Sequence, residues 1–208
     1  MTWNLPNILT AGRLLAAPLI AVVFLTLPRP FADFFALGLF VVASLTDFLD
    51  GYFARRWKQV TKLGAMLDPI ADKAMVVIAL MVIVGFSSMS LLLVLPAAII
   101  LFREVFVSGL REFLGDTAGT LKVTQLAKWK TATQMVAIAV LLAQGIFEHY
   151  FGMWSWGMDR DTVGQILTGA IEDELGLKTM YQGAVWTGQG GLVLLWAAAV
   201  LTFITGVD

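Results

Sequence analysis

Residues 47–72 read DFLDGYFARRWKQVTKLGAMLDPIAD, and this stretch places four aspartates between two strongly apolar regions. Asp47 and Asp50 are spaced i, i+3, and Asp68 and Asp72 are spaced i, i+4, so each pair shares one face of an α-helix. A carboxylate at the edge of hydrocarbon costs roughly 2.5 kcal/mol or more, so four of them require a positive partner. One or two divalent cations suit four convergent oxygen donors.

The composition is that of an integral membrane protein. Of 208 residues, 59% are hydrophobic and only 14% are charged, and the mean hydropathy is +0.82, whereas a soluble domain carries about 25% charged residues. The formal net charge of −1 implies no bulk attraction to nucleic acid. The chain has no cysteine, which excludes disulfides and zinc–thiolate sites.

The apolar stretches predict an all-α fold with six transmembrane helices, in one membrane domain that covers residues 1–208. We expect the spans at about residues 13–28, 33–57, 65–86, 91–112, 123–147 and 184–205. Trp3 and the Asn and Pro residues of the segment 1–12 predict a short interfacial helix before the first span. The acidic segment 148–182 predicts an extracytoplasmic insertion between the fifth and sixth helices, with a short helix at 162–175.

The basic residues predict the orientation. Six spans place both termini on one side, and among the 14 Lys and Arg residues only Arg29, Arg160 and Lys178 fall on the opposite side. The positive-inside rule therefore puts both termini and the four aspartates in the cytoplasm. We expect the membrane to be a bacterial inner (plasma) membrane, with one cytoplasmic-face cavity that collects the acids and several basic groups.

The four aspartates suit phosphate chemistry. Two metal ions about 4 Å apart can stabilise both the attacking and the leaving oxygen of an in-line displacement, and hard oxygen ligands favour Mg²⁺ or Mn²⁺. Arg55 lies near Asp50 and would bind a phosphate, while Gly51 and Gly64 would allow a ligand or another backbone to approach closely. The alternative is that the acids only form interfacial salt bridges with Arg55, Arg56 and Lys73.

The same stretch resembles the full signature of the CDP-alcohol phosphotransferase family, which it matches at eight positions: Asp47-x2-Asp50-Gly51-x2-Ala54-Arg55-x8-Gly64-x3-Asp68-x3-Asp72. The resemblance implies a six-helix membrane enzyme, a homodimer, that joins a CDP-linked lipid to an alcohol and releases CMP. It also implies that the four aspartates bind two metal ions and that Asp72 is the general base. By the same resemblance the CDP moiety lies against Asp50, Gly51, Ala54, Arg55 and Gly64.

Three further stretches resemble the phosphatidylglycerophosphate synthase branch of this family. They are Asn4-Leu5-Pro6-Asn7 through Thr10 and Arg13, Arg103-Glu104 through residues 107–112, and Lys128-x-Lys130-Thr131 through Gln134. The branch implies CDP-diacylglycerol and glycerol 3-phosphate as substrates, with the CDP-lipid also bound by Asn7, Thr10 and Arg13. A dianionic alcohol requires a second cationic pocket, for which the candidates are Arg103, Arg111, Lys128 and Lys130. The alternative is that these cations anchor helix ends to lipid head groups.

Two other functions remain open from the sequence. A sister enzyme of the family would use another alcohol, as a cardiolipin synthase or a phosphatidylinositol phosphate or phosphatidylserine synthase does. A divalent-cation transporter would use the aspartates as a permeation site, which predicts acids near the bilayer midplane on broken helices. The aspartates instead sit at span ends beside glycines and an arginine, and this position disfavours transport.

Overall fold

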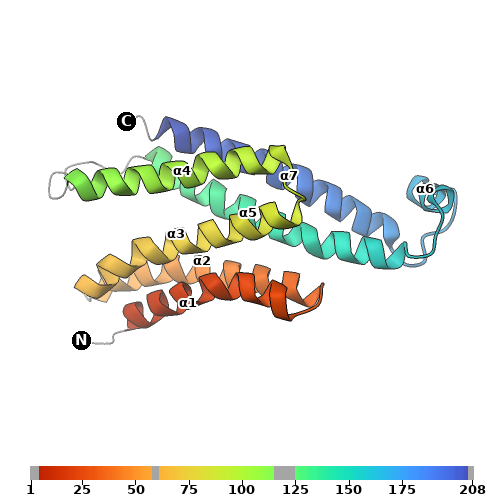
Figure 1. The fold of residues 1–208 in the computed structure, drawn as a ribbon. Coiled ribbons are helices and arrows are strands. Elements are labelled where there is room, and N and C mark those ends of the chain that lie inside the picture. The colour runs from red at the N-terminus through yellow and green to blue at the C-terminus, as the bar shows by residue number, and fades with distance from the viewer. Residues whose placement is uncertain (1–4, 58–60, 115–124, 206–208) are drawn as a thin grey trace.

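The computed structural model describes residues 5–57, 61–114 and 125–205, and the only regular secondary structure in these residues is α-helix (Figure 1). In chain order the helices are α1 Leu5–Thr26, α2 Phe31–Trp57, α3 Lys62–Phe86, α4 Leu91–Leu114, α5 Gln125–Trp154, α6 Arg160–Thr168 and α7 Leu177–Ile204. All except the 9-residue α6 are long and run along one common direction (Figure 1). The all-α prediction is confirmed for the described part of the chain.

The long helices share one core. Helix α1 packs against α2 and α3, and α7 packs against α4 and α5. The two groups of helices are joined where α2 packs against α5. Each long helix contributes a large side chain that is at most 1% exposed: Ile20, Phe40, Leu80, Ile100, Ile138 and Leu195. The bundle therefore has one continuous apolar interior, which fixes the positions of the helix ends relative to one another.

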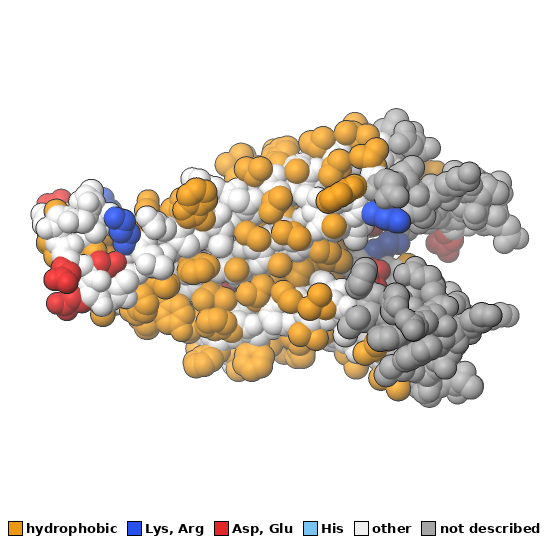
Figure 2. Space-filling view, turned by 180° about the vertical axis from the view of Figure 1, so that it is seen from behind, with side chains coloured by type: hydrophobic (Ala, Val, Ile, Leu, Met, Phe, Trp, Pro, Cys, Tyr) orange, Lys and Arg blue, Asp and Glu red, His pale blue; other side chains and the backbone are white. Residues whose placement is uncertain are grey.

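The outside of the bundle is also apolar, as expected for a protein surrounded by lipid. Figure 2 shows hydrophobic side chains over the middle of the molecule and charged ones toward its two ends. Among the described residues, five helical segments are long and apolar enough to cross a membrane: Asn7–Thr26, Met66–Phe86, Leu91–Leu110, Lys128–Trp154 and Leu177–Ile204. The 27-residue α2, predicted as a further span, carries acidic residues near both ends. Because α2 packs along α1 and α5, we infer that it crosses the same layer.

The start of α1 corrects one prediction. A separate interfacial helix was expected over residues 1–12, but residues 5–12 belong to one continuous helix, Leu5–Thr26. Pro6 lies in the first turn, where its missing N–H is not needed, so it does not interrupt the helix. Residues 1–4 lie outside the described part of the chain. The consequence is that Asn7, Thr10 and Arg13 share one rigid element.

The connection between the last two long helices is shorter than the predicted insertion 148–182. Helix α5 continues to Trp154 and α7 begins at Leu177, so both extend into that range. The carboxylate of Asp173 accepts hydrogen bonds from the backbone N–H groups of Leu177 at 2.7 Å and Lys178 at 2.9 Å, which explains the early start of α7. The short helix predicted at 162–175 is α6, Arg160–Thr168.

The two ends of the bundle differ. Helices α2 and α4 end, and α3 and α5 begin, at one end, which we call the α2–α3 end (Figure 1). Helix α6 and the connections beside it lie at the opposite end, which we call the α6 end (Figure 1). The predicted insertion and the aspartates of residues 47–72 are therefore separated by the length of the bundle.

Candidate functional site

Three of the four predicted metal ligands converge on one buried cation from α1. Arg13 is 3% exposed, and its Nη1 donates a hydrogen bond to Oδ1 of Asp72 at 2.8 Å. The same Nη1 binds Asp47 of α2, and Nη2 lies 3.4 Å from Oδ1 of Asp68. The three carboxylates are partly exposed, so one side of each faces away from the arginine. The structure thus gathers acids from α2 and α3 around a single positive charge.

The first turns of α1 also hold the beginning of α3. Thr10 Oγ1 donates to Oδ1 of Asp68 at 2.6 Å, and Thr61 Oγ1 donates to Oδ1 of Asn7 at 2.8 Å. Thr61 caps α3, because its side chain accepts a hydrogen bond from the N–H of Gly64 at 3.0 Å. A Cβ on Gly64 would lie 2.8 Å from Asn7 Oδ1. The group that lies close to Gly64 is therefore the side chain of Asn7, whereas the prediction was a ligand or another backbone.

A cavity of about 280 Å³ opens beside these acids at the α2–α3 end. Asp47 and Asp72 line one side, and α4 and α5 supply the facing side with Arg103, Glu104, Lys130 and Gln134. Two of the four cations predicted to bind glycerol 3-phosphate, Arg103 and Lys130, are therefore brought to the same space as two of the predicted metal ligands. The cavity has an acidic wall and a predominantly basic one.

Glu104 lies in the basic wall, although the sequence analysis gave it no role in the site. Its Oε1 lies 3.5 Å from Arg103 Nη1, and it also accepts a hydrogen bond from Lys130 Nζ. Glu104 thus neutralises part of the positive charge of Arg103 on α4 and Lys130 on α5, which would otherwise repel each other. Its signal in the sequence was an acid inside an apolar span, which is rare without a partner.

Lys73 is a second unpredicted member of the cavity. Its Nζ donates to Ser108 Oγ, and Ser108 Oγ donates to the backbone carbonyl of Glu104 at 2.5 Å. The sequence suggested Lys73 as a salt-bridge partner of the aspartates. Its hydrogen bond to Ser108 instead connects it to α4, so Lys73, which is adjacent to Asp72 in the chain, links α3 to the basic wall.

The remaining predicted site residues divide into two groups. Lys128 is exposed and is not among the residues that line the cavity, unlike Lys130. The side chains of Asp50, Gly51, Ala54, Arg55 and Arg111 lie outside the part that the structure describes, although their backbone belongs to α2 or α4. Their predicted roles remain predictions.

The donor set fits a divalent cation by its chemistry. The described carboxylates are hard oxygen ligands that already surround a positive group, the Arg13 guanidinium. Within the described residues no group of three acidic or histidine side chains is close enough to hold an ion as it stands. Asp47, Asp68 and Asp72 are the described residues that would hold such an ion; the side chain of Asp50, the fourth predicted ligand, lies outside the described part.

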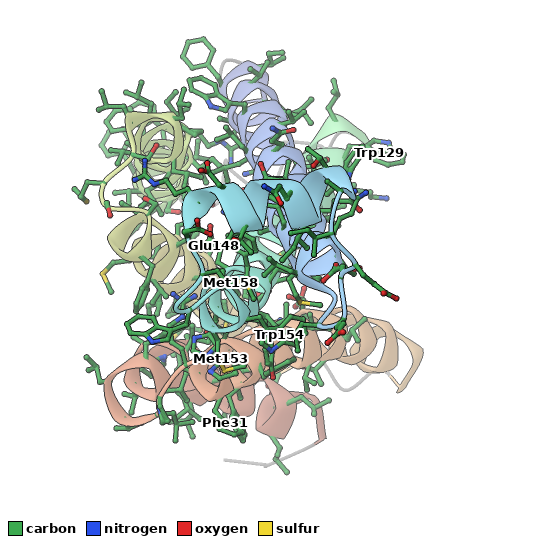
Figure 3. The ribbon with its side chains drawn as sticks, turned by 90° about the vertical axis from the view of Figure 1, so that its right-hand side faces the viewer. Phe31, Trp129, Glu148, Met153, Trp154 and Met158 are labelled. Atoms are coloured by element: carbon green, nitrogen blue, oxygen red, sulfur yellow. The ribbon has the colours of Figure 1, made fainter. Side chains whose placement is uncertain are left out.

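A second polar cluster lies at the α6 end and does not touch this cavity. Asp33 is 2% exposed and accepts two hydrogen bonds from Arg29, at 2.8 Å from Nε and 2.6 Å from Nη2. Figure 3 views the bundle from this end and labels Glu148, Met153 and Trp154 of the last turns of α5. The Arg29–Asp33 pair and Glu148 line a smaller cavity of about 100 Å³.

Comparison with known proteins identifies the family. A family model described as CDP-alcohol phosphatidyltransferase matches residues 3–159, which is most of the chain. The chain belongs to this family. The matched range includes the acids, Arg13 and both walls of the cavity, so the resemblance carried by residues 47–72 is confirmed. It ends before α6 and α7, Arg160–Thr168 and Leu177–Ile204.

Individual relatives match over a longer range. A CDP-diacylglycerol–glycerol-3-phosphate 3-phosphatidyltransferase of Cereibacter sphaeroides is 56% identical over 100% of this chain and 94% of its own length. A relative with the same name from Rickettsia bellii is 37% identical over 98% of this chain and 91% of its own length. Another from Escherichia coli is 42% identical over 74% of this chain and 85% of its own length.

Proposed function

We propose that this protein transfers the phosphatidyl group of CDP-diacylglycerol to sn-glycerol 3-phosphate and forms phosphatidylglycerophosphate and CMP. The observation that carries the proposal is the two-walled cavity, in which Asp47 and Asp72 face Arg103 and Lys130. An acidic wall suits cations bound to a diphosphate, and a basic wall suits a phosphorylated alcohol. The name of the 56% identical relative supports the same reaction.

Asp72 would act as the general base. It would take the proton of the sn-1 hydroxyl, whose oxygen forms a bond to the lipid-side phosphorus of CDP-diacylglycerol. The bond from that phosphorus to the bridging oxygen breaks in line, and CMP leaves with the electron pair. Arg55, placed beside the CDP moiety by the family resemblance, would hold the charge of CMP, and Arg103 and Lys130 would hold the phosphate of the alcohol.

The cofactor, assembly and orientation are part of the same proposal. Asp47, Asp50, Asp68 and Asp72 would hold two Mg²⁺ or Mn²⁺ ions, which when bound supply positive charge to the diphosphate. The family resemblance favours a homodimer. The proposed location is an inner membrane, and the positive-inside rule favours an orientation with the α2–α3 end in the cytoplasm, where glycerol 3-phosphate and CMP are soluble.

The decisive experiment offers radiolabelled CDP-diacylglycerol and Mn²⁺ to the purified protein together with one alcohol at a time. We expect CMP release with glycerol 3-phosphate and none with phosphatidylglycerol, inositol phosphate or serine. Release with another alcohol alone would assign the protein to a sister activity of the family. Metal flux into proteoliposomes without CMP release with any alcohol would contradict the proposal altogether.

Asp72→Asn tests the role of the base. This variant should lose about 100-fold or more in turnover, because a proton-accepting group is removed. Its affinity for CDP-diacylglycerol, titrated without the alcohol, should fall much less. Equal loss of turnover and of CDP-lipid affinity would reduce Asp72 to a ligand. Asp161→Asn, an exposed acid on α6, is the matched control and should change neither quantity.

A further inference from the structure

Two buried polar atoms of the basic wall are not hydrogen-bonded. The side-chain oxygen Oε1 of Gln134 and the Nε of Arg103 are inaccessible, and neither has a hydrogen-bond partner in the part of the chain that the structure describes. Gln134 as a whole is 4% exposed, and both residues line the cavity that also contains Asp47 and Asp72. A buried polar group without a partner is costly, so such groups mark places where a ligand or a water belongs.

The two atoms are complementary to a single kind of group. Gln134 Oε1 is an acceptor and Arg103 Nε–H is a donor. A hydroxyl both donates and accepts, so one hydroxyl can satisfy the oxygen, the nitrogen or both. A phosphate oxygen cannot serve Gln134 Oε1, because a phosphate dianion has no proton to donate. A hydroxyl therefore suits both atoms, whereas a phosphate oxygen suits only Arg103 Nε.

The position of Gln134 specifies which hydroxyl it meets. Gln134 is four residues after Lys130 on α5, so both lie on one face of the helix about 6 Å apart along its axis. Because α5 begins at the α2–α3 end, Gln134 lies deeper in the bundle than Lys130 (Figure 1). Lys130, Gln134 and Asp72 all line the one cavity, so a substrate with its phosphate at Lys130 and its reacting hydroxyl at Asp72 shares that cavity with Gln134.

We propose that Gln134 determines the specificity for the alcohol by accepting a hydrogen bond from the non-reacting secondary hydroxyl of a glycerol phosphate. Arg103 Nε donates to the same oxygen. This inference rests on the proposed function and adds to it the group that distinguishes a glycerol phosphate from a simpler hydroxyalkyl phosphate. Gln134 takes no part in proton transfer, so its removal changes selectivity between alcohols and leaves the bond-forming chemistry in place.

The test compares two substrates that differ only in this hydroxyl, sn-glycerol 3-phosphate and 3-hydroxypropyl phosphate. For the wild-type protein we expect kcat/KM to favour glycerol 3-phosphate by at least about tenfold, the value of one hydrogen bond to a buried partner. Gln134→Leu should bring the ratio close to one, and the loss should come from glycerol 3-phosphate. Gln134→Glu keeps an acceptor oxygen and should keep most of the preference, whatever its effect on KM for both phosphates.

Met135→Leu is the matched control, because Met135 is the neighbouring residue and lines the same cavity with an apolar side chain. It should leave the ratio at the wild-type value. An unchanged ratio in Gln134→Leu, or an equal loss with both substrates, would overturn the inference and assign Gln134 to a bound water or to packing. If the wild-type protein released no CMP with either substrate, the proposed function itself would fail, which the alcohol screen above identifies separately.

Discussion

Nη1 of Arg13 lies 2.8 Å from Oδ1 of Asp72, so a buried cation from the first helix occupies the point where the acids of α2 and α3 meet. The same nitrogen also binds Asp47. Arg13 therefore neutralises the charge that would otherwise drive the two carboxylates apart. A divalent cation in the proposed site must compete with this arginine for Asp47 and Asp72.

Removal of Arg13 should strengthen metal binding and weaken catalysis. In Arg13→Ala we expect the half-saturating Mn²⁺ concentration to fall about tenfold, because a competing unit charge is lost next to half-exposed carboxylates. Turnover should fall at least about tenfold, because Arg13 also orders the acids. Mn²⁺ binding is measured by electron paramagnetic resonance on the protein in detergent. Weaker Mn²⁺ binding in this variant would mean that Arg13 organises the acids and does not compete for them.

Arg160→Ala is the matched control for this experiment. Arg160 is an exposed arginine at the start of α6, at the opposite end of the bundle, so its removal changes the net charge equally. We expect its Mn²⁺ affinity to equal that of the wild-type protein. A parallel shift in both variants would indicate an effect of total charge and not of the contact with Asp72.

Lys130 and Lys128 should differ in their effect on the alcohol substrate. Lys130 is 5% exposed and lines the cavity, whereas Lys128, two residues away on α5, is exposed. Lys130→Ala should raise the KM for glycerol 3-phosphate about tenfold or more with little change in the KM for CDP-diacylglycerol. Lys128→Ala should leave both KM values within about twofold. Steady-state kinetics with each substrate varied in turn gives the four values, and an equal rise in both variants would support the sequence-based assignment of Lys128 to the pocket.

The contrast between these lysines shows what a motif alone leaves undetermined. The spacing of Asp47, Asp50, Asp68 and Asp72 predicted their shared faces, because helical periodicity acts over one turn. Residues two apart on a helix point about 200° apart, so Lys128 and Lys130 cannot both face one cavity. Which of them does depends on how α5 is rotated against α4, and this rotation is set by packing between distant segments.

Other parts of the site follow from contacts over long sequence separations. The stretch with Asn7, Thr10 and Arg13 was assigned to the CDP-lipid by resemblance, but its contacts with Asp47 and Asp68 depend on α1 packing against both α2 and α3. Glu104 could be noticed as an acid in an apolar span, yet its pairing with Lys130 crosses from α4 to α5. Local patterns predicted the helices, and tertiary packing decided the partners.

Gly64→Ala should disrupt the junction of α1 and α3. The added Cβ would lie 2.8 Å from Asn7 Oδ1 and 3.3 Å from Thr61 Oγ1, both of which take part in the capping network. We expect a loss of about 1–2 kcal/mol in unfolding free energy, the usual effect of a lost cap, together with reduced turnover. Gly12→Ala is the control on α1, because nothing lies within 4 Å of its Cβ position. The melting temperature is measured by thermal unfolding in detergent. An equal shift in Gly64→Ala and Gly12→Ala would contradict this account.

Asp173 should stabilise the start of α7 in a pH-dependent way. The hydrogen bond from the backbone N–H of Lys178, together with the one from Leu177, lowers the pKa of Asp173 below its ordinary value. A lowered folded-state pKa means that the stabilisation is complete above the ordinary pKa and is lost as pH falls through the lower value. The difference in melting temperature between wild type and Asp173→Ala should therefore be constant from about pH 5 to 7 and shrink below about pH 4. Glu172→Gln, at the neighbouring exposed acid, should leave the melting temperature at pH 7 at the wild-type value.

Gly145→Ala should separate stability from activity, because it acts at the α6 end alone. A Cβ on Gly145 would overlap with Arg29 Nη2 and with Oδ1 of the buried Asp33. Breaking a buried ion pair costs about 3–5 kcal/mol, so we expect a large fall in melting temperature. The residues that line the proposed active cavity are untouched, so the protein that remains folded at low temperature should keep its kcat and both KM values.

Gly152→Ala is the control, because Gly152 lies on the same helix and nothing lies within 4 Å of its Cβ position. It should leave the melting temperature unchanged or slightly higher. If kcat fell together with the stability in Gly145→Ala, the two ends of the bundle would be coupled. That result would contradict this prediction, because the two ends have separate clusters of contacts.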